Sequence, residues 1–152
     1  LRLRAARATK PISKGEPILS YPRAVTMDMA SLSGCPCAHF VDEAYWKGSP
    51  WYVQLALWLL SEEEKGLASE WSPYIALLPR TISVPLDWTD VQLEMLAYPS
   101  LINGIKQQRK EFIEILEATK PHLKVAHSDI HRLEWAMQIA LSRTFQSAPP
   151  RV

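Results

Sequence analysis

The sequence has 152 residues, of which 47% are hydrophobic and 22% charged, and its formal net charge is +1. This composition is typical of one globular domain or of part of a larger one. The near balance of 17 basic and 16 acidic residues argues against general nucleic-acid binding, which needs a concentrated positive field. No apolar run approaches the length of a membrane span, so we expect no membrane insertion.

The first part of the chain carries patterns typical of strands and loops. Short extended runs at 16–22 and 24–27 follow a turn region around Gly15, and the prolines at 17 and 22 place them near the edge of a sheet. Residues 28–50 are interrupted by glycine and proline, which predicts a loop of unusual length.

Helical patterns dominate the rest of the chain. Residues 51–66 predict an apolar helix with Gly66 as its C-terminal cap, and 70–79 predict a short helical turn that Pro79 stops. Thr89 and Gln92 have the spacing of a capping box, in which each side chain bonds a backbone amide of the other.

Two longer helices follow. Residues 100–119 place Leu101, Ile105, Phe112 and Leu116 on one face. Ser128 or Asp129 can cap the last helix. Its predicted apolar face is formed by Ile130, Leu133, Met137, Ala140 and Leu141.

Two groups of residues could hold a metal ion, and each also has a plainer interpretation. Cys35, Cys37 and His39 lie close together, but structural zinc needs four ligands, so small buried thiols in a loop are the alternative. A disulfide between the two cysteines would close a very small ring, and a reducing compartment fits better. His127 and His131, with Glu134, could share a metal or lie on a solvated helix surface.

Charged and aromatic runs in the sequence also have more than one interpretation. The run 62–64 predicts a solvated helix end. The basic stretch Lys106, Arg109 and Lys110 predicts a helix surface rather than a nucleic-acid contact, because acidic residues interrupt it. The aromatic residues around the 48–50 turn predict core packing, with a partner surface as the alternative. They are Tyr45, Trp46, Trp51 and Tyr52.

Three stretches resemble the split-SET methyltransferases of the Rubisco large-subunit type, a family that includes cytochrome-type lysine methyltransferases and a related actin-histidine methyltransferase. The first stretch is 7–19, which resembles the opening strand, turn and strand of the family. The second runs from 55–60 through the Trp-Ser-Pro-Tyr-Ile-Ala-Leu-Leu-Pro block at 71–79 to Trp88 and Leu93. The third is 133–145.

The resemblance implies an α+β fold, with a partial SET-domain β core followed by a mainly α-helical insert. Residues 1–50 would form the first half of the SET core, and 51–132 the helical insert. Residues 133–152 would begin the return to the core, which is then truncated. The order of strand-like and helix-like patterns along the chain agrees with this interpretation.

The same resemblance implies S-adenosylmethionine as cofactor, with Arg7 and Arg143 near it and Ser142 beside Arg143. Several features depart from the family. Leu3 and Ala5 stand where glycines usually let the backbone approach the cofactor. The Asn-His pair that binds the cofactor is absent from the sequence, and its last tyrosine, Tyr98, lies in the insert. We therefore expect no catalytic residue and no bound cofactor in this chain alone.

Two functions remain as hypotheses. The first is a catalytically incomplete methyltransferase relative that acts as a structural or interaction subunit, with protein partners in a larger assembly. The alternative is a fragment of an S-adenosylmethionine-dependent protein-lysine N-methyltransferase whose catalytic half lies elsewhere. A nucleic-acid-associated module is a weaker third. The plastid enzymes of the resembled family suggest a chloroplast.

Overall fold

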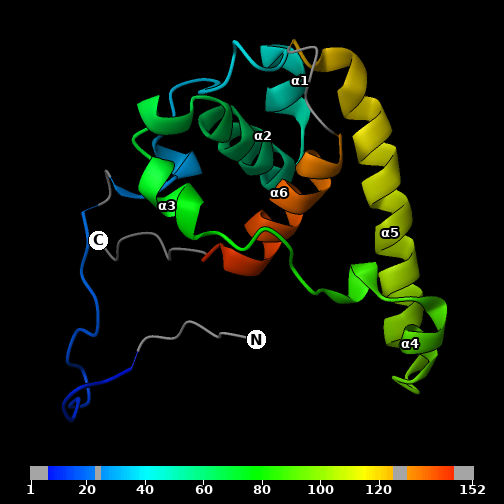
Figure 1. The fold of residues 1–152 in the computed structure, drawn as a ribbon, viewed down its shortest axis with the longest axis horizontal. Helices are drawn as coiled ribbons and strands as arrows, with labels where there is room; N and C mark the ends of the chain where they lie inside the picture. The colour runs from blue at the N-terminus through cyan, green and yellow to red at the C-terminus, as the bar shows by residue number, and fades with distance from the viewer. Residues whose placement is uncertain (1–6, 23–24, 125–129, 146–152) are drawn as a thin grey trace.

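The computed structural model describes residues 7–22, 25–124 and 130–145, and within these ranges the chain is mainly helical (Figure 1). The α-helices are α1 (Glu43–Gly48), α2 (Trp51–Glu64), α3 (Ser72–Leu77), α4 (Asp90–Glu94), α5 (Pro99–Thr119) and α6 (Ile130–Arg143). One short 3-10 turn, η2 (Met29–Ser31), precedes α1, and three others lie between the helices: η3 (Gly66–Ala68), η4 (Pro85–Asp87) and η5 (Lys120–His122). No described helix combines the length and the apolar character needed to cross a membrane.

The core forms where α2 packs against α6, two helices far apart in the sequence (Figure 1). Both helices bury most of their circumference, which is the pattern of helices at the centre of a fold. The largest fully buried side chains of the pair are Leu57, Leu133, Met137 and Val53. The indole of Trp135 on α6 donates a hydrogen bond to the Pro79 carbonyl at 2.9 Å, which ties the end of α3 to this core.

Several sequence predictions are confirmed. The helix predicted over 51–66 is α2, and Gly66 follows it with φ +57°, a left-handed conformation that glycine adopts without steric cost. The Thr89 hydroxyl accepts from the Gln92 amide, and the Gln92 side chain accepts from the Thr89 amide, so the capping box of α4 is present. The predicted caps Ser128 and Asp129 lie outside the described residues.

The long helix α5 stands beside the core and buries only part of its predicted apolar face (Figure 1). Ile105 and Phe112 are buried, whereas Leu101 is 47% exposed. Arg109 lies one turn after Ile105, on the same side of the helix, and donates to the backbone carbonyls of Pro85, Leu86 and Trp88. This arginine fixes the connection before α4, which a reading of Arg109 as a solvated surface residue did not foresee.

The predicted α+β fold is wrong for the described residues, which contain no strand. Residues 7–22 form turns and bends. The β pairing seen in the rest of the described chain is a single antiparallel bridge between Val41 and Leu123. A strand is stable only when a neighbouring strand pairs with it, and 7–22 has no such partner among the described residues. Ile18 and Leu19 are 82% and 75% exposed, so this segment contributes little to the core. The described part of 1–50 therefore does not form the expected β core.

The long loop predicted over 28–50 is also partly wrong. Its second half contains α1, and Trp46 of that helix is buried. Two backbone hydrogen bonds hold the residues just before α1 to the segment that follows α5. Asp42 donates to the His122 carbonyl at 3.0 Å, and Lys124 donates to the Phe40 carbonyl at 2.9 Å. Tertiary packing thus ordered a segment whose glycines and prolines had suggested a loop.

The packing of α2 against α6 gives a direct stability test. Leu57→Ala removes a fully buried side chain, so we expect the free energy of unfolding to fall by about 2–5 kcal/mol. Leu67→Ala is the matched control, because Leu67 is 97% exposed and its loss should change stability by no more than about 0.5 kcal/mol. Urea denaturation followed by circular dichroism measures both, and equal effects would contradict the assigned core.

Candidate functional site

The three predicted cofactor-binding residues are placed at the surface. Arg7 is exposed in the N-terminal segment, and Arg143 is exposed at the last position of α6. The Ser142 hydroxyl donates to the Gln138 carbonyl one turn earlier, at 2.7 Å. Partial burial raises the pKa of Tyr74 on α3, and the positive charge of Arg143 opposes that rise. No described contact joins Arg7 to Ser142 or Arg143.

The two cysteines lie side by side, and their thiols form a hydrogen bond but no disulfide. Their sulfur atoms are 3.7 Å apart, and both thiols are free. Burial raises the pKa of the Cys37 thiol, and the neighbouring Cys35 raises it further. His39 approaches the Ser61 hydroxyl at 3.5 Å rather than either sulfur. Among the described residues no three potential ligands gather around one point. The His127 of the second predicted cluster lies outside the described residues.

The acidic run at the end of α2 is not the solvated face that its sequence predicted. Glu62 is only 6% exposed and accepts hydrogen bonds from Lys65 and Ser69, both at 2.6 Å. Glu63 pairs with Arg132 of α6 and with Arg80. Because a buried carboxylate is costly unless it is paired, these contacts hold the end of α2 in one conformation. Within the run, Glu64 is exposed as expected.

The aromatic residues around the 48–50 turn divide between core and surface. Trp46 is buried, as the core interpretation predicted, and its indole donates to the Gln54 carbonyl at 3.0 Å. Trp51 is 46% exposed. The ring of Tyr45 stacks on His122 with centroids 4.3 Å apart, and its hydroxyl meets that of Thr119 at 2.7 Å.

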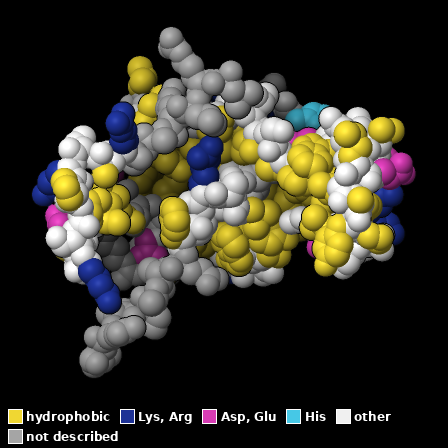
Figure 2. Space-filling view, turned by 90° about the horizontal axis from the view of Figure 1, so that it is seen from below, with side chains coloured by type: hydrophobic (Ala, Val, Ile, Leu, Met, Phe, Trp, Pro, Cys, Tyr) yellow, Lys and Arg dark blue, Asp and Glu magenta, His cyan; other side chains and the backbone are white. Residues whose placement is uncertain are grey.

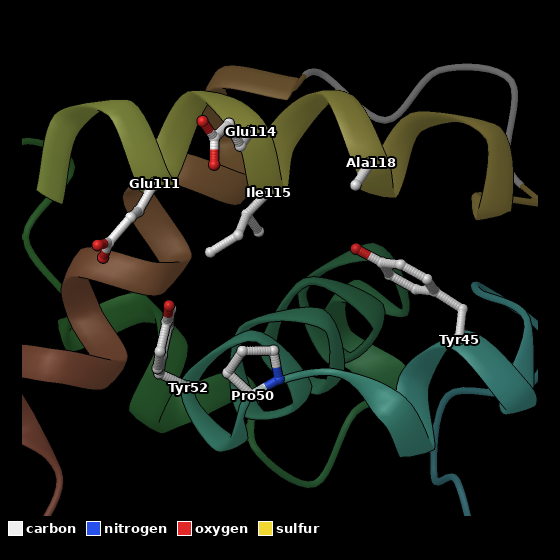
Figure 3. A pocket seen from close by; sticks show the side chains of 7 residues that line it. All are labelled: Tyr45, Pro50, Tyr52, Glu111, Glu114, Ile115 and Ala118. Carbon is white, nitrogen blue, oxygen red and sulfur yellow. The ribbon is translucent and has the colours of Figure 1, made fainter. Parts of the chain in front are cut away.

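A shallow groove of about 410 Å³ opens between α5 and the junction of α1 with α2 (Figure 3). One wall comes from α5, and the other comes from Tyr45, Tyr52 and the proline between α1 and α2. Both phenol groups point toward α5, and the Glu111 carboxylate points toward Tyr52 (Figure 3). The lining residues are Tyr45, Pro50, Tyr52, Glu111, Glu114, Ile115 and Ala118. Burial raises the pKa of Tyr52, and the nearby Glu111 carboxylate adds to the rise.

A second feature is an apolar tip, which we define as the exposed side chains of Val91, Met95, Tyr98 and Leu101. These residues lie on α4 and at the start of α5, and Met95 is 80% exposed. Figure 2 shows apolar side chains gathered at this end of the molecule. The turn between the two helices holds Ala97 at φ +51°, a conformation that non-glycine residues rarely adopt. Arg109 anchors the connection that precedes the tip.

Sequence reasoning missed the groove and most of the apolar tip. Glu111 and Glu114 entered only as residues that interrupt a basic stretch, and Pro50 only as a breaker of regular structure. Their spacing on one helix did carry a signal, since residues three apart share a side of an α-helix. The opposite wall depends on tertiary packing of α1, which the sequence did not predict.

Comparison with known proteins shows one methyltransferase relative. Over 90 residues the chain is 34% identical to the actin-histidine N-methyltransferase of Drosophila melanogaster. The matched region makes up 59% of this chain and 16% of that enzyme. The chain is therefore methyltransferase-related and spans about a sixth of the relative's length. Scans of protein-family models and of solved structures gave no match. The finer likeness to Rubisco-type SET enzymes stays a prediction.

The buried carboxylate gives a pH prediction. Burial acts to raise the pKa of Glu62, but hydrogen bonds from Lys65 and Ser69 outweigh it and hold the pKa below the ordinary value of 4.5. Stabilisation from this group is thus present above pH 4.5 and is lost as the pH falls through the lower folded-state pKa. We expect Glu62→Gln to destabilise the protein by about 1–3 kcal/mol at pH 7.

The difference between Glu62→Gln and the parent protein should narrow below pH 4.5, when the parent loses the same contribution. Glu64→Gln serves as the control, because Glu64 lies two residues after Glu62 on the same helix and is exposed. This substitution should change the free energy of unfolding by no more than about 0.5 kcal/mol. Denaturant titrations from pH 3 to pH 7 measure both variants. A gap that is constant over this range would show that Glu62 does not titrate as described.

Proposed function

We propose that this chain is a helical interaction unit of a methyltransferase-related protein and that it transfers no methyl group by itself. The contrast between a closely packed α2–α6 core and an exposed apolar tip carries the proposal. Exposed apolar surface on an otherwise well-packed domain is typical of a site where another protein binds. The likeness to an actin-histidine N-methyltransferase supports the relation to that enzyme class.

The cofactor expected from the resemblance finds little support in the geometry. The groove between α5 and α1–α2 is not lined by Arg7, Ser142 or Arg143. These residues also do not line a second, smaller hollow beside α4, which is formed by Trp88, Gln92, Met95 and Leu96. The Ser142 hydroxyl is engaged with its own helix. These residues do not form a cradle for S-adenosylmethionine, so we derive no transfer step from them.

A second candidate is a piece of an active methyltransferase whose catalytic residues lie outside this sequence. The relative is more than six times longer than the matched region, which favours this alternative. The sequence resemblance suggests a protein side-chain nitrogen as the acceptor: lysine in most of the resembled family and histidine in the relative. A chloroplast location remains a prediction without support from the relative, which is an animal protein.

Cofactor binding distinguishes a non-catalytic unit from an enzyme. We expect equilibrium dialysis of this chain with radiolabelled S-adenosylmethionine to show no saturable binding, and incubation with lysine- and histidine-containing acceptor proteins to transfer no label. Saturable binding at micromolar concentration would overturn the proposal. Measuring the intact mass of the native product separates the alternative, because a much longer product that transfers label would make this chain one piece of an enzyme.

A further inference from the structure

The lining of the groove between α5 and the α1–α2 junction carries negative charge. Its lining contains two carboxylates, Glu111 and Glu114, and no lysine or arginine. Glu111 accepts one hydrogen bond, from the Gln107 side-chain amide at 3.2 Å. Glu114 has no partner among the described residues. The cation next along the helix, Lys120, is paired with Glu117 at 2.5 Å.

The rest of the lining is apolar or aromatic. Ile115 and Ala118 line the α5 side, and Pro50 faces them across the groove (Figure 3). Tyr45 and Tyr52 hold fixed positions, because one stacks on His122 and the other on Phe112. An apolar floor beside two carboxylates suits a side chain with a hydrocarbon stem and a cationic end.

We propose that this groove binds an arginine side chain presented by an extended segment of a partner protein. The guanidinium would pair with Glu111 and Glu114, while its stem lies along Ile115 and Ala118. Arginine fits better than lysine, because its planar group can bond two carboxylates and stack on a tyrosine ring. This inference rests on the proposed role as an interaction unit and names the chemistry of its partner.

The dimensions agree with such an occupant. From Glu111 to Ala118 the groove follows α5 for about two turns, which is roughly 10 Å. An extended peptide advances about 3.3 Å per residue, so the groove accommodates about three residues, one of them the arginine. The open, shallow shape suits a surface peptide rather than an enclosed small molecule.

Nuclear magnetic resonance titration of the full chain tests this inference. The probe is the capped peptide acetyl-Gly-Leu-Arg-Leu-Gly-amide, and the matched peptide has citrulline, which keeps the shape of arginine without its charge. We expect the arginine peptide to shift the amide signals of residues 111–118 in a saturable manner. The citrulline peptide should bind about tenfold more weakly, because two ion pairs are lost.

Two sets of variants locate the site. The double variant Glu111→Gln with Glu114→Gln should weaken arginine-peptide binding about tenfold, whereas Glu70→Gln with Glu94→Gln, at exposed positions outside the groove, changes the net charge equally and should leave affinity within about twofold. Ala118→Lys places a cation one turn after Glu114 and should also block binding. Thermal melts confirm that each variant is folded.

Two results would overturn the inference. One is the absence of saturable shifts with the arginine peptide, and the other is binding that the groove variants do not weaken. Neither result would contradict the proposed role as an interaction unit. That role is contradicted by saturable cofactor binding or by methyl transfer, which are measured in a separate experiment.

Discussion

The contact between α2 and α6 is the constraint on which the remaining structure depends. The two helices are separated by 65 residues along the chain, between the end of α2 at Glu64 and the start of α6 at Ile130, yet they supply most of the largest fully buried side chains of the core. Closing that contact positions everything between them. The α3 segment is held to α6 through the bond from Trp135 to the Pro79 carbonyl, and α5 lies against the same core through Phe112.

Charged groups at the end of α2 reinforce this contact. Glu62 and Glu63 direct their carboxylates to partners within the fold, one of them Arg132 on α6. Buried charges require such partners, so these residues serve stability. Glu111 and Glu114 on α5 lie instead beside an open groove with no cation in its lining. The same residue type thus has a structural role at one position and a proposed binding role at the other.

Local patterns in the sequence predicted local structure well. The apolar run of α2, the glycine at 66 and the Thr89 capping box depend on neighbours within a few residues, and all three are found. The strands expected near the N-terminus are absent from the described residues because a strand needs a distant partner, which local patterns cannot supply. The burial of Glu62 and the groove beside Glu111 depend on tertiary contacts, so neither could be predicted from spacing alone.

Hydrogen exchange measured by mass spectrometry on the intact chain tests the central claim most directly, namely that a helical core held by α2 and α6 supports exposed binding surfaces. Amides of these two helices should exchange slowest, since they open only when the core does. Residues 7–22 should exchange rapidly, because the backbone bond recorded there joins Glu16 to Ser13 within one turn. Protection of 7–22 comparable to that of α2 would show that this segment forms a sheet, and would contradict the account.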